Sequence, residues 1–176
     1  MTPAPVLPRT VVVGLGNPLL SDDGVGVYAA RLLAERLAGA PVSIEESSLG
    51  GMRFLDLLAG FDRAIIVDAI QWQRGPVGTV YRLSPDEAVP TVRAVSFHDI
   101  NLGTALALGR KLGIPLPTEI VFLAVEVRDT LSVSERCSPE VEAALPEVVR
   151  LVEDQLAAWG VAPEARCTKQ GSPSTL

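Results

Sequence analysis

The chain has 176 residues, 48% of them hydrophobic and 20% charged, and a net charge of −6. Its length suits one domain with a substantial core, and its composition is typical of a globular protein. The negative charge disfavours a nucleic-acid partner, because neutralising phosphates requires clustered Lys and Arg. No apolar run reaches the roughly 18 residues of a membrane span, and the first residues lack the pattern of a secretory signal. We therefore expect a cytoplasmic protein with no membrane partner.

Segments with strand and helix signals alternate along the chain. In chain order, they predict a strand at 10–15, a helix at 24–38, a strand at 42–47, a helix at 51–59, strands at 63–69 and 78–83, a helix at 99–112, a strand at 119–127 and a helical region at 139–158. Ser138 is the expected N-cap of the last region, with Pro139 at its first helical position. Pro146 lies inside that region and predicts a kink or two consecutive helices.

The strand segments at 10–15, 63–69 and 119–127 are continuous Val/Ile/Leu runs, which indicates strands buried on both faces. Strands separated by helices predict a mostly parallel sheet between helical layers. The sequence thus predicts a single three-layer α/β domain over residues 1–162. The polar, unpatterned tail at 163–176 is expected to be disordered.

The loop after the first strand, GLGNPLLSDDGVG at 14–26, begins like a phosphate-binding turn but departs from that pattern. Pro18 lacks an N–H, Leu19 stands where a third glycine would be, and the carboxylates of Asp22 and Asp23 would repel a phosphate. A nucleotide-binding domain is therefore the weaker hypothesis. A structural interpretation also exists, in which Asp22 caps the helix at 24–38 and Asp23 adds favourable charge there.

Polar side chains stand near the ends of two predicted strands and at the start of a predicted helix: Asp22 and Asp23, Asp68, and His98, the only histidine. If the sheet is parallel, these groups converge on its carboxyl edge, where ligands bind in such folds. Two carboxylates and an imidazole suit a divalent transition-metal ion and leave a coordination position open. Each also has a structural alternative: Asp68 could form an Asx-turn, and His98 could start a helix or pack in the core.

The segments GLGNPLLSDDGVG, IIVDAI and FHDINLG closely resemble the three signature regions of the hydrogenase maturation endopeptidases. These proteases remove the C-terminal extension from the large subunit of NiFe hydrogenases. The turn at 50–52, Gly-Gly-Met, is also similar to one in this family, and the resemblance runs from about Val11 to about Leu156. It implies a twisted sheet of about five strands with helices on both faces.

The resemblance implies that Asp23, Asp68 and His98 hold nickel, or a substitute such as zinc or cadmium. Asp22 matches a further acidic position of the family, and some relatives carry Glu where this chain has Asp23. The nickel would arrive with the substrate, the precursor of the large subunit, and its presence would permit cleavage. An open three-ligand site gains affinity when the precursor's thiolates share the ion, so loaded and empty precursors would be distinguished.

The residue inventory limits how the peptide bond could break. If His98 binds nickel, no second histidine remains to activate a serine or cysteine nucleophile, so Cys137 is expected to be a small packing or surface residue rather than a nucleophile. Metal- or carboxylate-assisted hydrolysis remains, with Asp23 or Asp22 as catalytic general base. The alternative is a non-catalytic nickel-sensing or chaperone module for the same precursor. A monomer is the simplest expectation.

Overall fold

The computed structural model of the protein describes residues 8–48, 53–84 and 102–161. The predictions made for residues 50–52, for His98 and for the tail at 163–176 lie outside these ranges. None of the described helices is long and apolar enough to cross a membrane.

Within the described residues, five strands form one sheet in the order β2-β1-β3-β5-β4. Their bounds are Thr10–Leu15 for β1, Ser43–Ser47 for β2, Arg63–Ile70 for β3, Val80–Leu83 for β4 and Glu119–Glu126 for β5. The strands β2, β1, β3 and β5 are parallel to one another, and only the edge strand β4 runs antiparallel, against β5. The prediction of a mostly parallel, five-stranded sheet is confirmed.

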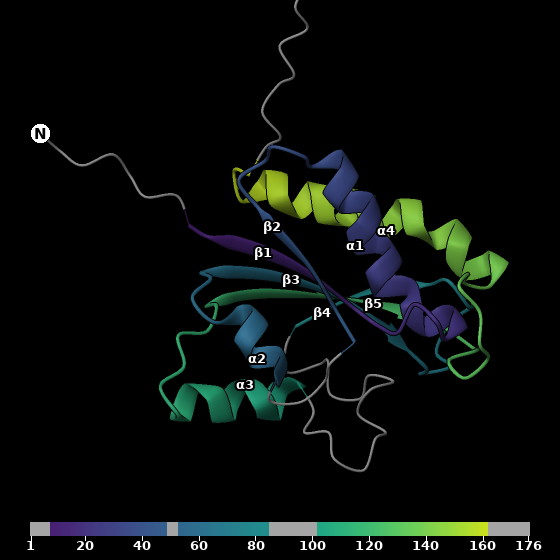
Figure 1. The fold of residues 1–176 in the computed structure, drawn as a ribbon, viewed down its shortest axis with the longest axis horizontal. Coiled ribbons are helices and arrows are strands. Elements are labelled where there is room, and N and C mark those ends of the chain that lie inside the picture. Colours follow the sequence, from purple (N-terminus) through teal and green to yellow (C-terminus); the bar gives the residue numbers. More distant parts are fainter. Residues whose placement is uncertain (1–7, 49–52, 85–101, 162–176) are drawn as a thin grey trace, which may run out of the picture.

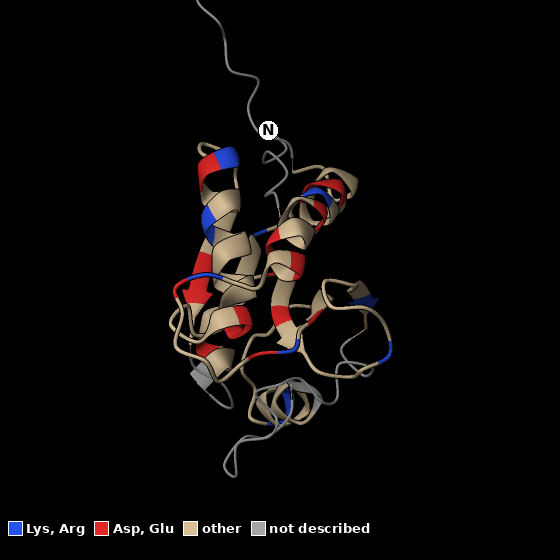
Figure 2. Ribbon diagram, turned by 90° about the vertical axis from the view of Figure 1, so that its right-hand side faces the viewer, with Lys and Arg blue, Asp and Glu red and all other residues tan. Residues whose placement is uncertain are grey.

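Helices cover both faces of this sheet (Figure 1). The long helices α1 (Val25–Arg36) and α4 (Pro139–Ala158) lie on one face, and α2 (Arg53–Leu58) and α3 (Leu102–Lys111) lie on the other. A short 3-10 helix, η1 (Ser21–Gly24), directly precedes α1. Red and blue segments are interspersed along the helices of the upper layer (Figure 2), so this side of the molecule does not present a basic surface of the kind that binds nucleic acid.

Strand β3 shows why the apolar runs are continuous. Its odd-numbered residues Ile65, Val67 and Ala69 pack with the core under α1 and α4, whereas Ala64, Ile66 and Ile70 pack with the core under α2 and α3. Each fully buried aliphatic side chain of this kind contributes about 1.5–3 kcal/mol. By the same alternation, Asp68 belongs to the α2/α3 face.

Helix α4 differs from its prediction. Ser138 and Pro139 occupy the expected N-cap and first positions, but the region forms one 20-residue helix with Pro146 inside it, so the hypothesis of two consecutive helices is wrong. Proline removes one intrahelical hydrogen bond. The buried apolar stripe that runs past it, which includes Val141, Val148 and Val152, offsets that loss through packing.

Two glycines allow α1 to contact the backbone of the sheet. A Cβ atom on Gly26, in the first turn of α1, would lie 2.3 Å from the Leu15 carbonyl oxygen and 2.4 Å from that of Val67. A Cβ atom on Gly14 of β1 would lie 2.1 Å from the Gly26 carbonyl oxygen. Only residues without a side chain permit this approach, which fixes η1 at the carboxyl end of β1.

The substitution Gly26→Ala is expected to lower the free energy of unfolding by about 1–3 kcal/mol or more, because the added methyl group meets two backbone oxygens that cannot rotate away. Urea denaturation measures this change. Gly39→Ala is the control, since Gly39 has φ +87° but no atom within 4 Å of its added Cβ, so it loses only about 1–2 kcal/mol to the left-handed backbone. Equal stability of Gly26→Ala and wild type would contradict the close-contact explanation.

Candidate active site

The backbone of the loop after β1 has no N–H group left for a phosphate. Every N–H from residue 16 to residue 23 donates within the protein at 2.7–3.1 Å, and Pro18 has none. The pairs are Gly16 to the Ser47 carbonyl, Asn17 to Asp23 Oδ2, Leu19 to Asn17 Oδ1, Leu20 to the Asn17 carbonyl, Ser21 to the Ser134 carbonyl, Asp22 to the Asp129 carbonyl and Asp23 to the Leu20 carbonyl. The glycines of this loop therefore serve packing, and the nucleotide-binding hypothesis loses its physical basis.

Asp22 is fully buried and binds backbone groups distant in sequence. Its Oδ1 accepts the N–H of Ser138 at 2.6 Å, and its Oδ2 accepts those of Asp129 and Arg128 at 3.3 and 3.4 Å. The N-cap of α1 is Gly24, without a side-chain hydrogen bond, so the interpretation of Asp22 as the cap of that helix is wrong. Asp22 instead joins the β1 loop to the loop before α4.

The N-terminus of α4 uses this distant carboxylate in place of its own N-cap side chain. The Ser138 side chain makes no capping bond, and its buried Oγ has no hydrogen-bond partner among the described residues. The negative charge of Asp22 at the N-terminus of a 20-residue helix is electrostatically favourable. A capping function is thus performed by a residue 116 positions earlier in the chain.

Asp23 and Asp68 lie at the carboxyl end of the β1–β3 pair. Asp23 is 6% exposed, and its Oδ2 accepts the Asn17 N–H at 2.7 Å. Asp68 is 1% exposed, and its Oδ1 accepts the Ala69 N–H at 2.8 Å. The β1–β3 register pairs Gly14 with Val67, so Asp68 stands beside the last residue of β1, and η1 packs against β3. Asp68 lies within β3, which continues to residue 70.

The predicted nickel ligands are thus placed in part. The two carboxylates, on Asp23 and Asp68, stand at one edge of neighbouring strands, whereas His98 lies outside the described residues. Within residues 8–48, 53–84 and 102–161, no three His, Cys, Asp or Glu side chains are grouped so that they could hold a metal ion. The three-ligand set remains a prediction.

A further buried carboxylate, Glu126, was not singled out by the sequence analysis. It is 2% exposed; its Oε1 accepts the Gln73 N–H at 3.0 Å, and its Oε2 accepts the Tyr81 hydroxyl at 3.2 Å. Burial and this carboxylate raise the pKa of Tyr81. Asp68 pairs with Ala124, so Glu126 follows on the same face of the sheet, at the end of β5. A carboxylate that interrupts an apolar strand, as Asp68 also does, is the sequence signal that would have identified it.

Cys137 is buried, and its Sγ donates to the Ser21 carbonyl oxygen at 3.7 Å. Burial raises the pKa of its thiol to about 12, with smaller contributions from Asp22 and Glu142. A thiol of this kind is protonated at neutral pH and is a poor nucleophile, and of the two roles that the sequence left open, packing or surface, its burial selects packing.

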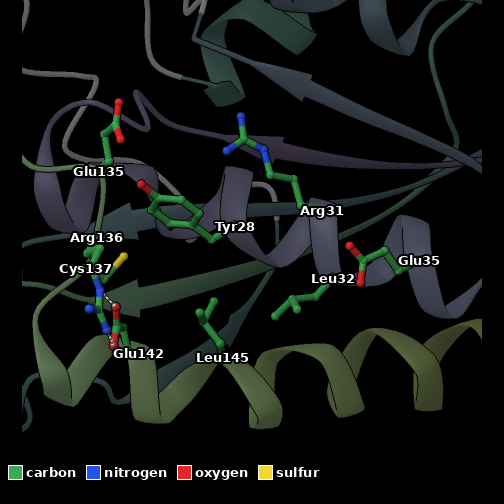
Figure 3. Close-up of a pocket in the computed structure, with 9 residues that line it drawn as sticks. All are labelled: Tyr28, Arg31, Leu32, Glu35, Glu135, Arg136, Cys137, Glu142 and Leu145. Carbon is green, nitrogen blue, oxygen red and sulfur yellow. Dashed lines mark hydrogen bonds and ion pairs between the residues drawn. The ribbon is translucent and has the colours of Figure 1, made fainter.

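Cys137 also lines a groove of about 370 Å³ between α1 and α4, shown in Figure 3. Tyr28, Leu32 and Leu145 give it an apolar lining, and the ion pair of Arg136 with Glu142, at 3.2 Å, stands at one end. This groove is on the α1/α4 side of the sheet. By strand alternation, Asp68 belongs to the other face, so the groove and the Asp68 carboxylate are separated by the sheet.

Comparisons with known proteins identify the family. Residues 27–155 match the hydrogenase maturation protease family. The chain is 31% identical over 156 residues to the hydrogenase 2 maturation protease of Escherichia coli K12, covering 87% of this chain and 93% of that protein. It is 28% identical over 160 residues to the hydrogenase expression/formation protein HoxM of Cupriavidus necator, covering 89% and 78% of the two chains.

The fold gives the same result. The structure of the hydrogenase maturating endopeptidase HybD from E. coli matches with a TM-score of 0.72 and 27% identity, over 87% of this chain and 94% of that one. Fold and sequence together define a peptidase. The chain belongs to the hydrogenase maturation protease family.

The substitution Asp22→Asn is expected to lower the free energy of unfolding by about 2–3 kcal/mol. Whichever way the amide is turned, its NH2 group faces a backbone N–H, and a buried donor loses its acceptor. Urea denaturation measures the loss. Asp154→Asn is the control, because Asp154 is an exposed partner of Arg150 and is expected to change stability by less than about 0.5 kcal/mol. If both variants were equally stable, Asp22 would not hold the two loops together.

Cys137 is expected to resist iodoacetamide at pH 8 in the native protein and to react in urea, because unfolding removes the burial that raises its pKa. Peptide mapping by mass spectrometry distinguishes it from Cys167. Rapid labelling of Cys137 in the native protein would show an accessible thiolate and would contradict its packing role.

Proposed function

We propose that this protein acts as a monomer in the cytoplasm and removes the C-terminal extension from the precursor of a NiFe hydrogenase large subunit. In this proposal, cleavage follows insertion of nickel into the precursor, and Asp23, Asp68 and His98 contact that nickel. Membership of the hydrogenase maturation protease family supports the reaction class. The nickel dependence is proposed from the resemblance of the three signature segments to this family, and the two carboxylates at one edge of the sheet support it.

The observation that carries the proposal is the placement of two buried carboxylates at one edge of the sheet. Asp23 and Asp68 are each less than a tenth exposed, on loop and strand positions whose geometry is fixed by the parallel β1–β3 pair. Carboxylates suit a divalent cation, and an imidazole completes a set that accepts nickel or zinc.

Nickel in this account belongs to the substrate. Three protein ligands leave coordination positions for the thiolates of the precursor, so protein and precursor bind the ion together. A precursor without nickel lacks this shared interaction and binds more weakly. The protease would thereby distinguish a completed metal centre from an empty one before the irreversible cut.

Asp23 is better suited than Asp22 to take a proton from water. Both oxygens of Asp22 accept backbone N–H groups of the loop before α4 and tie that side chain to the scaffold, whereas Asp23 Oδ2 accepts the Asn17 N–H within its own loop, at the edge of the sheet shared with Asp68. In the proposed step, the water oxygen bonds to the scissile carbonyl carbon while Asp23 takes a water proton, and the peptide C–N bond then breaks as Asp23 gives that proton to the departing amine. The nickel of the precursor, when bound at Asp23, Asp68 and His98, would supply a Lewis acid that polarises the carbonyl.

Incubation of a nickel-loaded precursor with the protein, followed by mass analysis, tests the proposal. Wild type is expected to release a C-terminal peptide. The single variants His98→Ala, Asp68→Asn and Asp23→Asn are expected to process at least about 100-fold more slowly, and Asp22→Asn is expected to lose less activity than Asp23→Asn. Asp154→Asn, on the exposed face of α4, serves as the control and should process at the wild-type rate.

Two results would overturn parts of the proposal. Unimpaired processing by the folded His98→Ala variant would contradict the hypothesis that this histidine recognises nickel. Binding of the precursor by wild type without any release of peptide would favour the non-catalytic nickel-sensing module.

A further inference from the structure

Large exposed hydrophobic side chains gather on two loops next to Asp23. Among the described residues, five large hydrophobic side chains are exposed, and three of them, Leu19, Leu131 and Val133, lie on the β1 loop and on the loop before α4. Leu131 and Val133 are 85% and 86% exposed. We name these three residues the apolar tip. Single exposed hydrophobics are ordinary, but a group of them indicates an interaction site.

Hydrogen bonds join the two loops that carry the apolar tip. The Ser134 N–H donates to the Leu19 carbonyl at 3.0 Å, and the Ser21 N–H donates to the Ser134 carbonyl at 3.1 Å. Leu20 and Ser134 thereby form an isolated parallel bridge. In Figure 1, the two loops lie side by side at the end of the sheet where β1 finishes. Leu19 and Val133 therefore stand next to each other across this bridge.

Both loops are held in shape by side chains that bind their backbones. Asp129 Oδ1 accepts the N–H groups of Leu131 and Ser132 at 3.1 and 2.9 Å, and Ser134 Oγ binds the backbone of Arg136. At the base of the same loop, the Asp22 carboxylate accepts further N–H groups.

The Leu19 side is fixed in the same way. Asn17 Oδ1 accepts the Leu19 N–H at 3.0 Å, and the Tyr28 hydroxyl donates to the Pro18 carbonyl at 2.7 Å. A preorganised loop loses little conformational entropy on binding, so its exposed apolar side chains contribute most of their burial energy to a partner. Order at the backbone combined with exposure at the side chains is typical of a docking surface.

The apolar tip and the proposed active site share one short loop. Leu19 is four positions from Asp23 in one tight loop, and the Asp23 N–H donates to the Leu20 carbonyl at 3.0 Å. A partner seated on the tip therefore lies beside the carboxylate that the proposed reaction uses.

We propose that the apolar tip docks an apolar surface on the folded body of the hydrogenase large-subunit precursor, and so positions its C-terminal extension at Asp23. This inference rests on the proposed function and adds a second point of contact to it, independent of nickel. Once the apolar tip has bound the precursor, the C-terminal extension is held near Asp23 at a high effective concentration. The protease therefore does not depend on the sequence of the extension alone for recognition. Loss of the tip then weakens precursor binding without changing the bond-breaking step.

The test compares the double variant Leu131→Asp/Val133→Asp with Leu112→Asp. Leu112 is 63% exposed just after α3, outside the two loops that carry the apolar tip, and is the control for a new surface carboxylate. Binding of nickel-loaded precursor is measured by surface plasmon resonance, and processing is measured by mass spectrometry as a function of precursor concentration. Circular dichroism verifies that each variant is folded.

The double variant is expected to weaken precursor binding and to raise KM by at least about tenfold, with kcat within twofold of wild type, while Leu112→Asp leaves both unchanged. Unchanged binding and KM in the double variant would overturn the inference, even if wild type processes the precursor normally. If the double variant changed the oligomeric state of the protein and left precursor binding unaffected, the apolar tip would be a contact between two copies of this chain. That result would also overturn the inference. If wild type binds but does not cleave, the proposed function fails, whereas weakened binding by the double variant still supports docking.

Discussion

The close approach of α1 to the ends of β1 and β3 is the constraint on which the site depends. Gly14 and Gly26 let the first turn of the helix lie on the carbonyl groups of both strands, where any Cβ atom would overlap a backbone oxygen. The chain must therefore turn within a few residues of the strand, through η1, and this turn carries Asp22 and Asp23. Glycines that resemble a phosphate-binding motif here act through steric fit, and the N–H groups that a phosphate would need are consumed within the loop.

Two adjacent carboxylates in that turn have different surroundings. Asp22 faces the loop before α4 and accepts hydrogen bonds from backbone N–H groups of that loop. Without it these buried donors would lack acceptors, so Asp22 belongs to the scaffold. Asp23 faces the loop of which it is part and stands at the edge shared with Asp68. The same scaffold holds the apolar tip in place. One buried carboxylate thus stabilises both surfaces that the proposed reaction uses.

The sequence predicted the sheet and its layers because continuous apolar runs and helical spacing are local signals. It placed Asp23 and Asp68 at strand ends for the same reason. It could not predict the partner of Asp22, because a capping preference describes neighbours in the chain, while Ser138 is 116 positions away. The sequence likewise could not predict whether Pro146 divides the helix. The answer depends on the packing of the buried face of α4, whose stabilisation outweighs the loss of one hydrogen bond. Glu126 was missed because, unlike Asp68, it lies outside the three segments that resemble the family's signature regions, and a lone carboxylate in a strand does not reveal its partners Gln73 and Tyr81.

The proposed selectivity follows from sharing one ion between two proteins. In this proposal, Asp23, Asp68 and His98 would leave coordination positions on the nickel, and the precursor would fill them. The most direct measurement is the dissociation constant of the complex with nickel-loaded and with nickel-free precursor, each titrated against wild type and Asp68→Asn. The account predicts at least about tenfold tighter binding of the loaded precursor by wild type, equivalent to about 1.4 kcal/mol, and the loss of that difference in the variant. Equal affinity of wild type for both precursors would contradict it.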